Sequence, residues 1–159
     1  MKYIIFICIT FSVMISCEED DICLDGKTPQ LFLKFQPRHS ADSLRMDSII
    51  VYRKEPNGNF DLVFAKSKNN PIDSIKVSLR IDEVNQTQLI LTKRRADISL
   101  YDTLTLNYNR ELAFGSKACG YKVEYIQVDY QITQQFFVEK EDLDTNITNE
   151  ETPHILLYY

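Results

Sequence analysis

The chain has 159 residues and a formal net charge of -5, with 23 acidic residues against 18 lysines and arginines. This balance excludes a broadly basic surface of the kind that binds nucleic acid. The four glycines are too few to build a glycine-rich phosphate loop. Nine tyrosines, nine phenylalanines and no tryptophan accompany many Ile, Leu and Val residues, which favours strands over helices.

The amino terminus has the pattern of a bacterial lipoprotein signal. Lys2 precedes an apolar run over residues 3–15, which is shorter than the roughly 20 residues of a membrane-spanning helix. Ile15-Ser16-Cys17 then fits a lipobox, although Met14 stands where Leu or Val is usual. We predict that residues 1–16 are a signal peptide and that Cys17 is acylated, so that membrane lipid is a partner. An ordinary secretory signal is the alternative.

An acidic run follows the predicted lipidation site and consists of Glu18, Glu19, Asp20 and Asp21. It resembles the signals that export lipoproteins of Bacteroidota-type bacteria to the cell surface, and a solvated tether is the other interpretation. Residues 17–28 are accordingly predicted as a lipidated tether. The expected location is the bacterial outer membrane, on its periplasmic face or at the cell surface.

Four cysteines are encoded, and two of them remain to be explained. Cys8 would be lost with the signal, and Cys17 would carry lipid. In an oxidising envelope, Cys23 and Cys119 are most simply a disulfide. The competing interpretation is a catalytic thiol, which would need a nearby base.

The rest of the chain, residues 29–159, is predicted as one domain. Short alternating apolar segments are separated by turn signals such as Glu55-Pro56-Asn57-Gly58-Asn59. They predict an all-β fold of 8–9 strands in a single antiparallel β-sandwich, immunoglobulin-like or transthyretin-like. The predicted strands cover residues 30–35, 48–53, 60–65, 73–81, 87–93, 102–109, 118–130, 136–139 and 155–159, with the longest over 118–130.

Three segments together carry a family resemblance. The first is residues 16–23, followed by Thr28-Pro29, and the second is residues 102–109 leading into 118–122. The third is residues 146–151 with 154–159. They resemble a family of small, uncharacterised lipoproteins of flavobacteria and related Bacteroidota, described only as a domain of unknown function. The resemblance implies an envelope location and a paired cysteine, and it implies no activity.

Candidate catalytic groups are few. The only histidines are His39, in a polar loop, and His154, which opens the last predicted strand and is expected to be structural. Neither lies in a nucleophile motif. Glu141, Asp142 and Asp144 form an acidic stretch that could serve a glycosidase only within a cleft of suitable spacing. We therefore predict no catalytic residue, no metal site and no cofactor.

Two further patterns allow two interpretations each. Asp followed by Ser or Thr and an aliphatic residue places potential O-glycosylation at Ser43, Ser48, Ser74 and Thr103, or caps the turns before strands. Tyrosines that cluster in sequence would form a binding face or be half-buried sheet residues; they are Tyr101, Tyr108, Tyr121, Tyr125 and Tyr130.

These observations lead to two functional hypotheses. The first is a non-enzymatic, envelope-anchored lipoprotein that binds or supports an envelope protein or glycan, or has a structural role. The alternative is a carboxylate-dependent hydrolase of an envelope or dietary polymer. The hydrolase requires a concave pocket with at least two convergent carboxylates.

Overall fold

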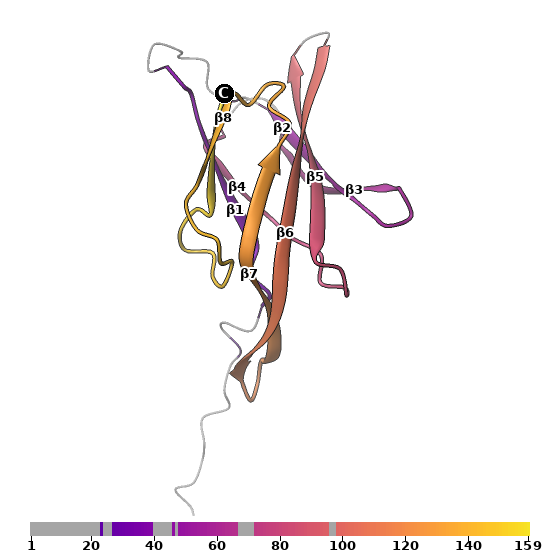
Figure 1. Cartoon of the computed structure of the whole chain (residues 1–159), viewed down its shortest axis with the longest axis vertical. Helices are drawn as coiled ribbons and strands as arrows, with labels where there is room; N and C mark the ends of the chain where they lie inside the picture. The colour runs from indigo at the N-terminus through magenta and orange to yellow at the C-terminus, as the bar shows by residue number, and fades with distance from the viewer. Residues whose placement is uncertain (1–22, 24–26, 40–45, 47, 67–71, 96–97) are drawn as a thin grey trace, which may run out of the picture. The chain divides into compact units, whose positions relative to one another are not determined.

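The computed structural model describes residues 23, 27–39, 46, 48–66, 72–95 and 98–159. This part of the chain forms nine strands and contains no helix (Figure 1). Accordingly, no helix within it could cross a membrane. The predicted signal peptide, Cys17, the acidic run over residues 18–21, and Ser43 lie outside the described residues.

The chain divides into two compact units. The larger comprises residues 28–113 and 123–159, and the smaller comprises residues 1–27 and 114–122. The larger unit contains two sheets, dominated by antiparallel pairs, that share one core. This confirms the predicted all-β sandwich.

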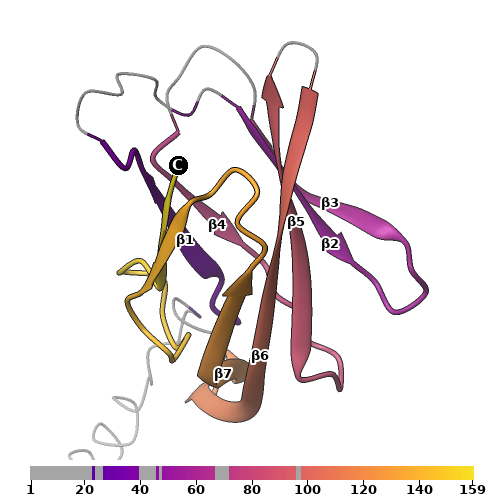
Figure 2. The ribbon, with the colours of Figure 1, turned by 45° about the horizontal axis from the view of Figure 1, so that its top comes forward.

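One sheet has four strands and the other has five. Figure 2 shows strands of both sheets. The first has the order β4 (Ser74–Val77), β1 (Leu31–Gln36), β9 (Ile155–Tyr158), β8 (Glu139–Asp142). The second has the order β3 (Phe60–Lys66), β2 (Ile49–Lys54), β5 (Gln86–Arg95), β6 (Ile98–Ser116), β7 (Gly120–Ile132). Strands β1 and β9 pair in parallel, with Leu33 opposite Ile155, so the sandwich is not purely antiparallel.

Alternation within each strand determines which side chains enter the core. In β1, Leu31, Leu33 and Phe35 are buried, whereas Lys34 and Gln36 are exposed. The same period places aliphatic residues of both sheets against one another. The core contains the stacked rings of Phe35 and Phe137, whose centroids are 5.7 Å apart. Its other members include Val51, Ile75, Val77, Leu89, Leu91, Leu104, Leu106 and Leu157.

The predicted turn between β2 and β3 forms a hairpin, and Glu55 lies at its first corner. The Gly58 N–H donates to the Glu55 carbonyl at 2.9 Å, and the Glu55 N–H donates to the Asn59 carbonyl at 2.8 Å. Gly58 has a φ of 82°, which its lack of a Cβ permits. Asn57 accepts from the Asn59 N–H through its side chain at 2.9 Å, as turn asparagines commonly do.

Several predicted strand boundaries are wrong. Strand β4 ends at Val77 rather than Ile81, and Ile81 is exposed although it continues the apolar alternation of this segment. Strand β6, with 19 residues, is longer than β7, with 13, although the sequence predicted the opposite. Strand β8 covers Glu139–Asp142, whereas the sequence predicts a strand over residues 136–139.

The shift of β8 has a physical cause in the buried carboxylate of Asp102. Its Oδ2 accepts the backbone N–H groups of Phe136 and Phe137, at 2.9 Å each. Its Oδ1 accepts the N–H of Gln135 at 2.6 Å and the hydroxyl of Thr133 at 2.7 Å. Since these N–H groups bind a side chain, they are not available to a strand ladder.

In the smaller unit, a disulfide joins Cys23 to Cys119, with Cα atoms 4.9 Å apart. This confirms the predicted pairing. Cys119 lies in the turn between β6 and β7, where its N–H donates to Ser116 Oγ at 3.1 Å. Gly120 follows with a φ of 71°, a conformation that glycine adopts readily.

Candidate functional site

The candidate site is a pocket of about 410 Å³ in the larger unit, which we call the Arg80 pocket. Its walls come from the end of β2, the following turn, and the segment that leaves β4. The chain departs from the sheet after Val77, so Arg80 and Asp82 are free to project beside the β2–β3 turn. The lining residues are Thr28, Pro29, Arg53, Glu55, Ser78, Leu79, Arg80, Ile81 and Asp82.

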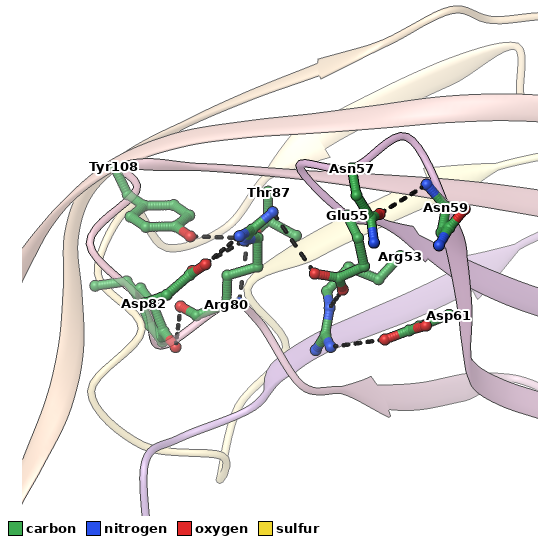
Figure 3. Close-up of polar contacts among 10 residues, drawn as sticks. Arg53, Glu55, Asn57, Asn59, Asp61, Arg80, Asp82, Thr87 and Tyr108 are labelled. Atoms are coloured by element: carbon green, nitrogen blue, oxygen red, sulfur yellow. Dashed lines mark hydrogen bonds and ion pairs between the residues drawn. The ribbon is translucent and has the colours of Figure 1, made fainter.

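Two arginines alternate with three carboxylates along the site (Figure 3). Arg80 Nε donates to Asp82 Oδ1 at 2.9 Å, and its Nη2 donates to Oδ2. On the other side, Arg80 Nη1 lies 3.8 Å from Glu55 Oε2. Glu55 also accepts from Arg53 Nε at 2.7 Å, and Arg53 Nη2 lies 3.7 Å from Asp61 Oδ2. Bidentate arginine–carboxylate pairs of this kind fix both groups in orientation.

The backbone of Arg80 is itself held by buried hydroxyl groups. Its N–H donates to Thr87 Oγ1 at 3.3 Å, and its carbonyl accepts from the Tyr125 hydroxyl at 3.0 Å. The Tyr108 hydroxyl lies 2.8 Å from Thr87 Oγ1, and the Tyr108 and Tyr125 rings meet edge-on with centroids 4.9 Å apart. The Arg80 side chain is only 8% exposed. These contacts fix the backbone from which the guanidinium projects.

The charges of the pocket affect its protonation. The hydrogen bond from Arg80 is the main reason that the pKa of Asp82 lies below its usual value. Burial raises the pKa of Tyr108, so its hydroxyl stays protonated. At neutral pH the pocket therefore presents an ionised carboxylate at Asp82.

The two histidines lie as the sequence indicated. His39 is exposed. His154 is buried, and its Nδ1 accepts the backbone N–H of Phe32 at 2.9 Å. Burial lowers the pKa of His154, which favours the neutral imidazole that this hydrogen bond requires. Its role is therefore structural.

The acidic stretch over the end of β8 and the residues after it does not converge on the pocket. Glu141 accepts from the Tyr158 hydroxyl at 3.1 Å, and Asp142 accepts from Lys140 Nζ at 2.7 Å. Asp144 accepts from the Asn146 N–H at 2.8 Å. Across the described residues, no group of three or more His, Cys, Asp or Glu side chains could hold a metal ion.

The five tyrosines do not form one exposed face. Tyr108, Tyr125 and Tyr130 are buried, and the Tyr130 hydroxyl donates to the Asp144 carbonyl at 2.9 Å. Tyr101 is exposed and lines an apolar depression of about 450 Å³ together with Tyr52, Phe60, Ile90 and Thr92. Tyr121 is exposed in the smaller unit.

The Asp-Ser and Asp-Thr triplets fall in different environments. Ser48 is buried, so a glycan there would have to be attached before folding. Ser74 and Thr103 are half-buried. At Ser74, the hydroxyl donates to Asp73 Oδ1 at 3.0 Å just where β4 begins.

The sequence interpretation missed the Arg80 pocket altogether. Its members lie at residues 28–29, 53, 55 and 78–82, and the packing of one sheet on the other brings Arg53 and Glu55 to the rest. A local signal did exist, since Arg80 and Asp82 are two residues apart after an alternating segment. That spacing is compatible with an ion pair between Arg80 and Asp82, but it does not indicate that Glu55 lies on the other side of Arg80.

Comparison with known proteins adds a family. The search of curated proteins gave no match, and neither did the search of solved structures. Residues 40–159 match the model of a family of unknown function designated DUF6452. This match covers most of the larger unit and the β6–β7 turn, but not the first of the three segments that suggested the resemblance. The chain thus belongs to the DUF6452 family of unknown function.

Proposed function

We propose that this protein is an envelope-anchored lipoprotein whose β-sandwich is a non-enzymatic binding or accessory module of the outer membrane or cell surface. The apolar run before Cys17 supports the anchor. The disulfide between Cys23 and Cys119 supports an oxidising compartment, because such bonds persist mainly in exported proteins. A flavobacterial or related origin belongs to the same proposal.

The pairing of carboxylates with arginines in the Arg80 pocket carries the choice of binding over hydrolysis. The pocket does bring Glu55 and Asp82 to one concave site, which is the geometric requirement for a carboxylate-dependent hydrolase. A general acid, however, must hold a proton near neutral pH, which usually requires a raised pKa. Arg80 has the opposite effect on Asp82. Glu55 is likewise occupied by Arg53 and Arg80.

The same groups suit recognition of a polar ligand. Guanidinium groups donate hydrogen bonds, carboxylates accept them, and the hydroxyls of Thr28 and Ser78 do both. Leu79 and Ile81 add apolar surface to the walls. A pocket with a few fixed polar groups among apolar walls is typical of binding sites. We infer an envelope glycan or a polar protein segment as the partner.

Photo-crosslinking in the native host tests this proposal. Ile81 lines the pocket and is 66% exposed, so benzoylphenylalanine at this position should reach a bound partner without disturbing the core. Leu143, which is 45% exposed on the segment after β8, provides the matched control. We expect one envelope component to be captured at position 81 and not at 143. Identical adducts at both positions, or none at either, would contradict binding at this pocket.

Surface export through Glu18, Glu19, Asp20 and Asp21, and glycosylation at Ser43, Ser48, Ser74 or Thr103, extend the proposal. Protease shaving of intact cells tests export, since a periplasmic protein would survive it. Mass spectrometry of the native protein tests glycosylation, and unmodified peptides at all four positions would remove it.

A further inference from the structure

Two aromatic rings are exposed where β6 ends and β7 begins, on either side of the turn that joins them; we include these strand ends in what we call the turn below. Phe114 is 59% exposed and Tyr121 is 69% exposed, and their rings meet edge-on with centroids 5.4 Å apart. Both belong to the smaller unit, together with Cys119. Large exposed aromatic side chains in contact with each other form an apolar patch, and its burial against a partner surface would be favourable.

Covalent connectivity limits how far this turn can be from the predicted lipid anchor. Cys119 is bonded to Cys23, and their Cα atoms are 4.9 Å apart. Cys23 follows Cys17 by six residues, and six residues span at most about 20 Å even when fully extended. An acylated Cys17 lies at the membrane surface, so the turn cannot lie much more than about 25 Å from it.

The side chains of the turn suit a membrane surface. Aromatic residues are enriched at the boundary between headgroups and acyl chains, where tyrosine places its ring in the apolar layer and its hydroxyl in the polar one. The exposed cations Lys27 and Lys117 belong to the same unit and would face anionic headgroups. The carboxylates at residues 18–21 oppose this attraction, so the aromatic contact rather than charge must hold the turn.

We propose that Phe114 and Tyr121 contact the lipid bilayer and form a second, non-covalent attachment beside the acyl chains of Cys17. This inference rests on the lipid anchor of the proposed function. The occupant is a phospholipid surface, because the disulfide and the short tether keep the rings within reach of one. The disulfide has a specific role here, since it couples the turn to the anchored end of the chain.

The absence of tryptophan from the chain allows a direct test. Single variants Phe114→Trp and Tyr121→Trp would each carry one fluorophore in the turn. Phe60→Trp is the control, because Phe60 is 56% exposed but lies on β3 in the larger unit. The lipidated proteins would be purified from membranes and reconstituted into vesicles of phosphatidylethanolamine and phosphatidylglycerol. Flotation then measures the anchor, and quenching by doxyl-labelled lipids measures contact of the tryptophan with the bilayer.

We expect both turn variants to float with the vesicles. Their tryptophan emission should lie at shorter wavelength in vesicles than in detergent-free buffer. Doxyl lipids should quench this emission at least twofold more than that of Phe60→Trp. Adding Cys23→Ser to Phe114→Trp should leave flotation intact and reduce the quenching. Proteins that float while both turn tryptophans are quenched no more than the control would overturn the lipid contact and leave the anchor standing. Proteins that do not float would overturn the anchor and the lipid contact together.

Discussion

His154 and Phe32 are joined by a reciprocal pair of hydrogen bonds. The Phe32 N–H donates to the imidazole Nδ1 of His154 at 2.9 Å, and the His154 N–H donates to the Phe32 carbonyl at 2.9 Å. The ring can accept only while Nδ1 carries no proton. Charging the ring would therefore break the first of these two hydrogen bonds between β1 and the segment that leads into β9.

The first prediction concerns pH. Burial lowers the pKa of His154 in the folded state, so protons bind the unfolded chain more readily. The stability contribution is complete above the unfolded pKa of about 6.5 and decreases as the pH falls below it. Urea unfolding measures the free energy of unfolding at pH 7.5 and at pH 5.0. Its decrease from the higher to the lower pH should be smaller in His154→Gln than in the wild type. His39→Gln, which changes the exposed histidine, should behave as the wild type. An equal loss in all three proteins would contradict this role.

The second prediction concerns Asp102, whose buried carboxylate accepts four hydrogen bonds. Asp102→Asn keeps the shape but turns an NH₂ group toward backbone N–H donors. Because hydrogen bonds to a charged group contribute about 1.5–3 kcal/mol each, we expect a loss of roughly 3 kcal/mol in the free energy of unfolding. Asp129→Asn, which removes the charge of an exposed carboxylate bonded to Gln131, should change stability by less than about 0.5 kcal/mol. If Asp102→Asn lost no more stability than Asp129→Asn, the hydrogen bonds of Asp102 would not have the stabilising role given to them here.

The third prediction concerns protonation in the Arg80 pocket. Carboxyl-carbon NMR should show the Asp82 pKa below its ordinary 3.8, and Arg80→Gln should raise it. Arg38→Gln is the control, because Arg38 pairs with Glu139, and it should leave Asp82 unchanged. An Asp82 pKa that did not move in Arg80→Gln would show that Arg80 does not keep Asp82 from acting as a catalytic acid.

The fourth prediction concerns the disulfide, which joins residues 96 positions apart and encloses most of the sandwich. Loop-closure entropy of the unfolded chain gives such a bond a stabilising effect of roughly 2–5 kcal/mol. The double variant Cys23→Ser/Cys119→Ser should unfold at correspondingly lower urea concentration. Cys17→Ser retains the bond and should unfold as the wild type does. If the free energies of unfolding of the double variant and the wild type differed by less than about 1 kcal/mol, the disulfide would not stabilise the fold as predicted.

The sequence predicted the fold well where its signals are local. Alternation identified β1 with its buried Leu31, Leu33 and Phe35, and turn residues around Gly58 identified the β2–β3 hairpin. Cysteine arithmetic identified the disulfide. Each of these depends on neighbours in sequence or on a scarce residue type, so no tertiary information was needed.

Predictions failed where distant contacts override the local pattern. The apolar residues at 136–137 read as a strand, but Asp102 takes their N–H groups. Ile81 fits the alternation of β4, yet the chain has already left the sheet. The parallel pairing of β1 with β9, and the meeting of Glu55 with Arg80, join segments that only the folded sandwich brings together.

Metabolic labelling with radioactive palmitate tests the lipid anchor most directly. We expect that the wild-type chain takes up label, that Cys17→Ser does not, and that globomycin causes the unprocessed precursor to accumulate. A Cys17→Ser protein that still incorporates palmitate, or that fractionates with membranes as the wild type does, would contradict the anchor at this residue.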